Sequence, residues 1–159
     1  ALLSPCSASL CLQVALEVLH RSQSPAASRL CRALIGHLAP PGPTPADSGL
    51  VSGLQDPVRS RLLEAAMMWA GPDLLRQLFR QQLRGQLRGL ANHRLANHGL
   101  QRLIDHAPQD VLQEVLSELG PALSDPLAAG HPGVLTSLAQ ACRHHPELQP
   151  EALRYLFQV

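Results

Sequence analysis

One apolar pattern occurs four times along this chain of 159 residues, and it restricts the fold more than any other feature. Aligned on the anchors Ser9, Ser60, Asn97 and Leu135, the four stretches lie 51, 37 and 38 residues apart. In each stretch the residues three, six and seven positions after the anchor are apolar, which is the spacing of one face of an α-helix. A unit of this length cannot bury its apolar face alone, so neighbouring units must stack into a solenoid.

A second helix is predicted after each of these stretches, at 26–38, 73–84, 109–119 and about 147–157. A proline, at 25, 72 or 108, directly precedes each of the first three, as is common at helix starts. Short helices at about 50–54, 86–92 and 121–128 would complete three-helix units. We therefore expect one all-α domain, 1–159, with repeats at about 1–38, 50–84, 86–119 and 121–159. A proline- and glycine-rich insertion loop at 39–49 accounts for the long first spacing.

The composition agrees with an all-helical chain. Leucine supplies 32 residues, whereas there are only four aromatic residues and two threonines, so nothing favours a sheet. The formal net charge is +1, and all 13 basic residues are arginine. Arginine suits planar stacking and phosphate recognition, although biased codon usage would produce the same excess. The chain does not begin with Met, and helical patterns run close to both ends, so we expect a fragment of a longer array.

Several classes of chemistry find no support in the sequence. No apolar run approaches the roughly 18 residues of a membrane span, and no signal peptide is apparent. The four cysteines lack a Cys-x-x-Cys pair, so we expect reduced thiols. The eight histidines show no zinc-ligand spacing, and no nucleophile motif or phosphate-binding glycine loop occurs. We expect no metal, no cofactor, no small-molecule substrate and no enzymatic activity.

The polar side of each main helix carries three positions of interest: the anchor, the next residue and the fourth after the anchor. The third repeat has the fullest set, because the amides of Asn97 and Gln101 lie one turn apart and planar His98 stands beside them. Amides can meet the Watson–Crick edge of a nucleobase, and a planar group can stack on its face. The alternative is that these are ordinary solvated side chains on an amphipathic helix.

The other repeats carry different trios. The second repeat has Ser60, Arg61 and Glu64, whose alternative interpretation is a surface ion pair between Arg61 and Glu64. The remaining trios are less polar: Ser9, Leu10 and Gln13 in the first repeat, where Ser9 could simply pack against a neighbour, and Leu135, Thr136 and Ala139 in the fourth.

Residues 93–101, His-Arg-Leu-Ala-Asn-His-Gly-Leu-Gln, resemble the Pumilio-type RNA-binding repeat, whose pattern is His-Pro-x-Gly-Asn-Tyr-x-x-Gln. Arg94 stands where that pattern has proline. The resemblance implies that each repeat of about 36 residues binds one base through its trio. It also implies that two side chains in each of three repeats recognise a particular base: Asn97 with Gln101 for uracil, Ser60 with Glu64 for guanine, and Ser9 with Gln13 for adenine.

The fourth repeat departs from the pattern, since Leu135 and Ala139 cannot hydrogen-bond a base through their side chains. With the long insertion, this departure makes the chain most similar to the family of the nucleolar Pumilio-like protein nine. The resemblance implies a right-handed α-solenoid of Pumilio-like three-helix repeats. Its expected partners are single-stranded or structured pre-ribosomal RNA and ribosome-assembly proteins, and its expected place is the nucleolus within the nucleus, in small-subunit maturation.

Two interpretations of function therefore stand after the sequence alone. In the first, the trios bind bases, and Arg94, Arg61 and Arg102 contact phosphates. In the second, the chain is a protein-binding scaffold of the armadillo or HEAT kind without direct base recognition. The near-neutral charge and the fourth repeat favour the scaffold, whereas the other trios favour RNA.

Overall fold

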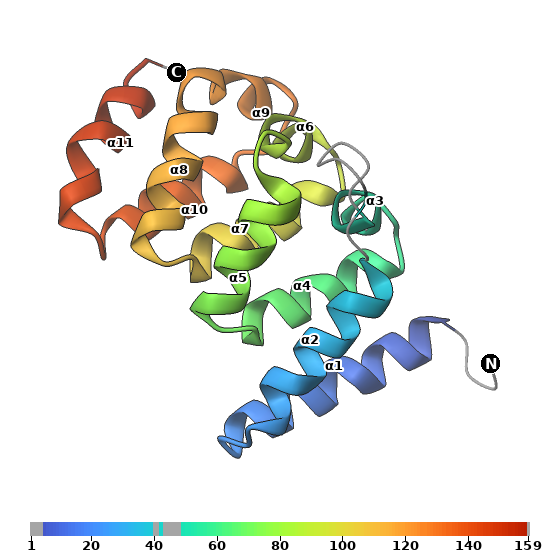
Figure 1. Cartoon of the computed structure of the whole chain (residues 1–159). Coiled ribbons are helices and arrows are strands. Elements are labelled where there is room, and N and C mark those ends of the chain that lie inside the picture. The colour runs from blue at the N-terminus through green and yellow to red at the C-terminus, as the bar shows by residue number, and fades with distance from the viewer. Residues whose placement is uncertain (1–4, 40–41, 43–48, 159) are drawn as a thin grey trace.

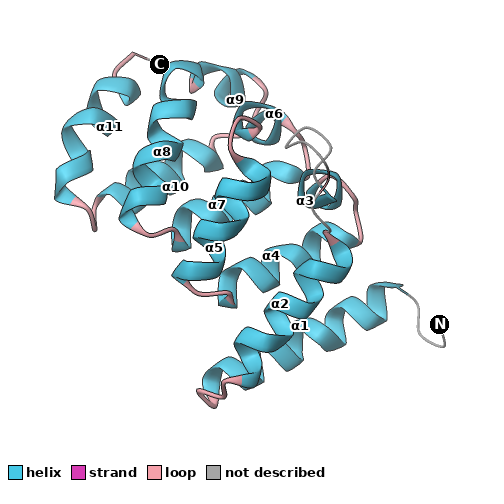
Figure 2. Cartoon of the chain, in the orientation of Figure 1, coloured by secondary structure: helices cyan, strands magenta, loops and turns pink. Residues whose placement is uncertain are grey.

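The structure is a computed structural model of the chain, and it describes residues 5–39, 42 and 49–158, with side chains from residue 10 onward. All regular secondary structure in these residues is helical (Figure 2). Most of the expected insertion loop, residues 40–41 and 43–48, lies outside the described residues. Among the described helices, none is long and apolar enough to cross a lipid bilayer.

Four helices form the main row of the molecule, and each carries one of the four anchors. They are α1 (Pro5–Arg21), α4 (Arg59–Trp69), α7 (Ala96–His106) and α10 (Gly133–Cys142). Helix α1 packs against α4, α4 against α7, and α7 against α10. Figure 1 shows the resulting progression from blue α1 at one end to red α11 at the other. The chain is an α-solenoid, as the recurring pattern predicts.

A second layer of helices packs behind this row. It consists of α2 (Ala26–Leu38), α5 (Pro72–Leu78), α8 (Gln109–Leu119) and α11 (Gln149–Leu156). Helix α5 continues as a π-helical turn, Phe79–Leu83, in which the Arg84 N–H donates to the Phe79 carbonyl at 2.8 Å. The last helix begins two residues later than expected, because Pro146–Leu148 forms a 3₁₀ turn.

Short helices complete the units. They are α3 (Gly49–Leu54), α6 (Leu87–Asn92) and α9 (Ser124–Ala128), the last preceded by a 3₁₀ turn at Gly120–Ala122. Helix α3 contacts α4, and α6 contacts both α7 and α8. These positions follow the predicted short segments closely, while the exact repeat boundaries remain a prediction.

The core is continuous along the stack and is built mainly of leucine. At the first aligned apolar position, Leu63, Leu100 and Leu138 are all at most 1% exposed. Full burial of a leucine side chain stabilises a fold by about 1.5–3 kcal/mol. The recurring apolar positions therefore supply much of the contact that joins one repeat to the next.

Two main helices begin with a similar side-chain cap four residues before the anchor. Oδ1 of Asp56 accepts hydrogen bonds from the backbone N–H groups of Val58 and Arg59, both at 2.9 Å. Nδ1 of His93 accepts from the N–H groups of Leu95 and Ala96 at 3.0 and 3.2 Å. These bonds satisfy N–H groups that the first helical turn leaves unpaired. The caps thus hold the first turns of α4 and α7, where the anchors lie.

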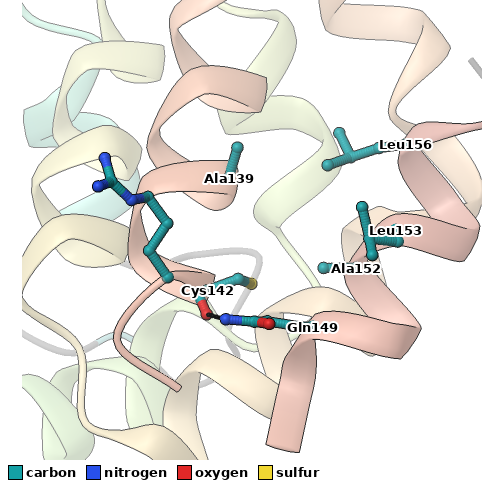
Figure 3. A pocket seen from close by; sticks show the side chains of 7 residues that line it. Ala139, Cys142, Gln149, Ala152, Leu153 and Leu156 are labelled. Carbon is teal, nitrogen blue, oxygen red and sulfur yellow. Dashed lines mark hydrogen bonds between the residues drawn. The ribbon is translucent and has the colours of Figure 1, made fainter. Parts of the chain in front are cut away.

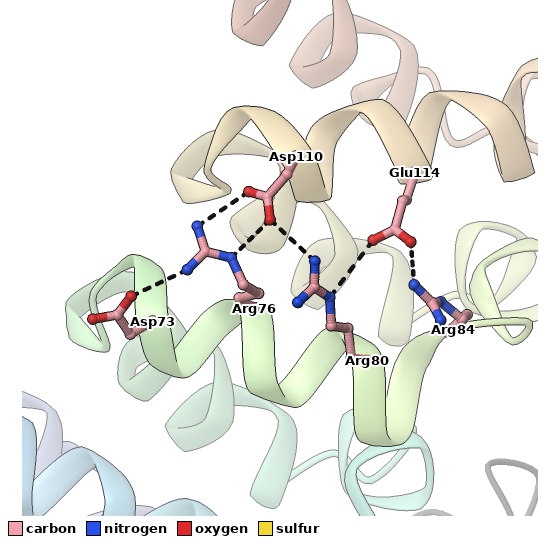
Figure 4. A network of polar contacts seen from close by, with 6 residues as sticks. All are labelled: Asp73, Arg76, Arg80, Arg84, Asp110 and Glu114. Carbon is pink, nitrogen blue, oxygen red and sulfur yellow. Dashed lines mark hydrogen bonds and ion pairs between the residues drawn. The ribbon is translucent and has the colours of Figure 1, made fainter.

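On the second layer, a row of ion pairs joins α5 and the π-helical turn that follows it to α8 (Figure 4). Nε of Arg76 lies 2.7 Å from Oδ2 of Asp110, and Nη2 of Arg80 lies 3.2 Å from the same oxygen. Glu114 then pairs with Arg80 and Arg84. Charged contacts therefore connect the second and third units on the layer behind the main row.

Candidate nucleic-acid interface

Helices α4 and α7 present their trios in the same way. The anchors are buried, since Ser60 is 4% and Asn97 is 3% exposed. The following residues, Arg61 and His98, are exposed, and the fourth residues after the anchors are half-buried. Because α4 packs directly against α7, these two trios lie on neighbouring helices in the same phase.

The burial of Asn97 differs from the open polar face that its helical phase predicts. Its Nδ2 donates to the backbone carbonyls of His93 and Arg94, both at 2.8 Å, and its Oδ1 accepts from Nε2 of Gln101 at 3.0 Å. The N–H of His98 donates to Leu95, three residues back, so the Arg94 carbonyl is available to the Asn97 amide. The side chain folds back onto the start of its own helix.

Glu64, the last residue of the α4 trio, is partly desolvated and lies near residues of α7. Burial raises the pKa of its carboxyl group, and the nearby side chains of His98, Arg102 and Arg61 oppose that rise. Among the ion pairs of the described residues, none joins Arg61 to Glu64, so the alternative of a simple surface pair is not formed. His98 and Arg102 of α7 therefore lie close to Glu64 of the α4 trio.

The outer two repeats are less well equipped. On α1, Leu10 is 59% exposed and Gln13 is half-buried, while the side chain of Ser9 lies outside the described residues. On α10, Leu135 is half-buried, and the exposed Thr136 donates its hydroxyl to the Pro132 carbonyl at 3.2 Å. The row of polar trios is thus strongest on α4 and α7.

The last position of the fourth trio, Ala139, lines a cavity of about 260 Å³ between α10 and α11 (Figure 3). Cys142, Ala152, Leu153 and Leu156 make most of its wall apolar. The Gln149 amide at its edge donates through Nε2 to the Cys142 carbonyl at 3.1 Å. Arg143 is the other polar side chain of its lining.

Gly133, the first residue of α10, contributes a contact that the sequence analysis did not single out. A Cβ atom on this residue would lie 2.5 Å from Nε2 of Gln101. The one sequence signal is that Ser7, Val58 and Leu95 stand at the equivalent position in the other repeats. A glycine in a single repeat does not reveal, without the stack, which side chain it accommodates.

The basic residues differ in how far they are committed to internal contacts. Arg94 and Arg61 are exposed, and neither takes part in an ion pair within the described part of the chain. Nη1 of Arg102 lies 3.4 Å from Oδ2 of Asp105, which partly neutralises it. Across residues 10–39 and 49–158, no group of three or more His, Cys, Asp and Glu side chains could hold a metal ion.

Stacked three-helix units with one polar trio on each of two neighbouring main helices define a helical repeat protein of the Pumilio class. The chain belongs to the family of the NOP9-like PUF repeat domain, whose sequence model matches residues 1–159.

Two curated relatives are similar over 152 residues, or 95% of this chain. Nucleolar protein 9 of Homo sapiens is 43% identical and nucleolar protein 9 of Mus musculus is 40% identical. The chain spans 24% of the length of each. The names of both relatives refer to the nucleolus.

Solved structures of a further protein share the fold. Two structures of APUM23, one without its insert region and with GGAAUUGACGG, the other with GGAGUUGACGG, superpose with TM-scores of 0.72 and 0.71. Each covers 93% of this chain at 23% sequence identity, while the chain covers 29% and 28% of the two structures. At this identity the likeness concerns the architecture.

Proposed function

We propose that the chain binds RNA along the row formed by α1, α4, α7 and α10, as a binding module without a catalytic step. The RNA is single-stranded or structured pre-ribosomal RNA in the nucleolus, and the process is maturation of the small ribosomal subunit. The proposed site comprises Asn97, His98, Gln101, Ser60, Arg61, Glu64, Ser9, Gln13 and Arg94, with ribosome-assembly proteins as a second class of partner.

The observation that carries this proposal is the matched arrangement of the α4 and α7 trios. In both helices an exposed planar side chain, Arg61 or His98, stands next to a half-buried polar side chain, Glu64 or Gln101. A planar group and a polar group at this spacing suit stacking and edge contact with successive bases. A scaffold that binds only proteins has no physical need for that repeated arrangement.

The electrostatic part of the proposal concerns Arg94, which is exposed at the start of α7 and free of ion pairs in the described residues. Each phosphate contact to single-stranded nucleic acid contributes roughly 0.7 to the slope of log affinity against log salt. We expect Arg94→Gln to weaken binding to every RNA sequence alike and to reduce this slope by about that amount.

The test is a titration of a randomised single-stranded RNA pool at several salt concentrations. Arg29→Gln is the matched control, because Arg29 is exposed on α2 in the second layer and the same charge is removed. If Arg94→Gln and Arg29→Gln give the same slope of log affinity against log salt, the RNA does not contact the start of α7. If the wild-type chain binds neither the pool nor structured RNA at low salt, the protein-scaffold interpretation replaces the proposal.

A further inference from the structure

We infer that, of the two amides in the third repeat, Gln101 contacts the edge of the base, Asn97 holds the Gln101 amide in place, and Gly133 of the next main helix provides the room for it. The third repeat then binds a base without strongly selecting it. This inference rests on the proposed function, and it departs from the uracil pair that the family resemblance implies for Asn97 and Gln101.

The first step is the hydrogen-bond inventory of Asn97. A side-chain amide has two N–H donors and one carbonyl oxygen with two lone pairs. Both donors of Asn97 are used, on the carbonyls of His93 and Arg94, and the oxygen already accepts one bond from Gln101. The two carbonyls can only accept, which fixes the orientation of the amide. Asn97, at 3% exposure, has no donor left for a base.

The second step concerns Gln101, which is half-buried and is therefore the more accessible of the two amides. One of its N–H groups donates to Oδ1 of Asn97 at 3.0 Å. The second N–H and the carbonyl oxygen remain for a ligand. This bond to Asn97 limits the rotation of the Gln101 amide, so Asn97 acts as a positioning residue.

The third step is the close approach of α10. A Cβ atom on Gly133 would lie 2.5 Å from Nε2, 2.8 Å from Cδ and 2.9 Å from Oε1 of Gln101. A side chain at position 133 would therefore push the Gln101 amide out of its present place. The fourth repeat, which lacks a polar trio, contributes to the interface by leaving this space to its neighbour.

The consequence follows from counting donors and acceptors on the bases. The N–H donor and the carbonyl acceptor of the Gln101 amide together match one acceptor and one adjacent donor on the Watson–Crick edge of a base. All four bases offer such a pair: O4 and N3–H in uracil, O6 and N1–H in guanine, N1 and N6–H in adenine, N3 and N4–H in cytosine. A single amide thus discriminates weakly, whereas a second donor from Asn97 would be needed to select one edge.

The experiment compares four single substitutions in the full chain: Gln101→Ala, Asn97→Ala, Gly133→Ala and, as control, Gly36→Ala. A Cβ on Gly36 meets nothing within 4 Å, so this change adds a helical alanine without a collision. Each protein is titrated with a randomised single-stranded RNA pool, the bound fraction is sequenced, and thermal unfolding is recorded.

We expect Gln101→Ala and Gly133→Ala each to weaken binding by about tenfold, the scale of one lost base contact, with little loss of Tm. Gly36→Ala should leave affinity unchanged. Asn97→Ala should lower both Tm and affinity, and the double variant of Asn97→Ala with Gln101→Ala should bind no more weakly than Gln101→Ala alone. The base composition of the bound pool should be the same for all variants.

Two results would overturn the inference while leaving RNA binding intact. One is a uracil preference at a single position that disappears in both Asn97→Ala and Gln101→Ala, because that would show direct recognition by Asn97. The other is wild-type affinity in Gly133→Ala. Failure of the wild-type chain to bind any RNA would overturn both this inference and the proposed function.

Discussion

At the scale of single residues, Glu64 shows how the position of a side chain in the stack changes its chemistry. Its place four residues after an anchor suggests a solvated carboxylate, yet packing of α7 against α4 partly removes it from water. Desolvation disfavours the charged form, and this raises the pKa despite the nearby positive groups. A group with a raised folded-state pKa favours the fold most below its ordinary value of 4.5 and loses that contribution as the pH rises through the folded-state pKa.

We therefore expect Glu64→Gln to raise the free energy of unfolding near pH 7 by less than about 1 kcal/mol, because it removes a partly buried charge. The gain should shrink as the pH falls through the folded-state pKa and should be lost below the ordinary value of 4.5, where both proteins carry a neutral side chain. Urea unfolding across this pH range measures it, with exposed Glu147→Gln as control. A lower stability of Glu64→Gln near pH 7 would contradict the desolvation argument.

At the scale of helices, the ion pairs between α5 and α8 stabilise the contact of two units on the second layer. Asp110 is central, because Arg76 contacts both of its oxygens, at 2.7 and 3.2 Å, and Arg80 contacts one. The hydrogen bond from Arg76 is the main reason that the pKa of Asp110 is lowered. A lowered pKa contributes stability above the ordinary value of 3.8, and this is lost as the pH falls through the folded-state pKa.

We expect Asp110→Asn to destabilise the chain by about 0.5–1 kcal/mol near pH 7, since exposed pairs contribute at most about this much. The difference from the wild type should vanish in acid. Asp73→Asn is the control, because Asp73 is 87% exposed and, among the described residues, forms an ion pair with Arg76 alone. Urea unfolding at the two pH values measures both, and equal effects of the two substitutions would show that Asp110 has no special role.

At the scale of the whole molecule, both end helices carry exposed apolar side chains. Leu10, Val14 and Val18 follow one another at four-residue spacing on α1 and are 55–59% exposed. At the other end, Leu153 on α11 is 50% exposed and Phe157 is 86% exposed. Contiguous apolar surface of this kind promotes association in water, and stacked repeats expose it wherever no neighbour covers the outer face.

We expect the isolated chain to self-associate as its concentration rises, as measured by sedimentation velocity. Replacing Leu10, Val14 and Val18 together by Gln should shift the distribution toward monomer without lowering Tm, because these side chains are already in water. Ala33→Gln, on exposed α2 surface, is the control. A wild-type chain that stays monomeric at every concentration would show that these faces do not associate.

The sequence by itself determined the helices and their phase. Apolar residues recur at helical spacing, so Leu63, Leu100 and Leu138 could be assigned to the core before the structure, and prolines marked the start of the second helices. The solenoid class and the third repeat as the one with the fullest trio followed from the same alignment. These features depend on residues close together in the chain, whose relative positions a helix fixes.

Only the three-dimensional structure decided which polar groups remain available, through local backbone contacts for Asn97 and through packing between helices for Gln101 and Glu64. Helical phase placed Asn97 on the polar side, but its donors are taken by backbone carbonyls at the start of α7. The contact of Gln101 with Gly133 and the desolvation of Glu64 arise where one main helix meets the next. Such contacts depend on how closely and at what angle successive units pack, and a one-dimensional pattern of apolar positions does not contain that distance.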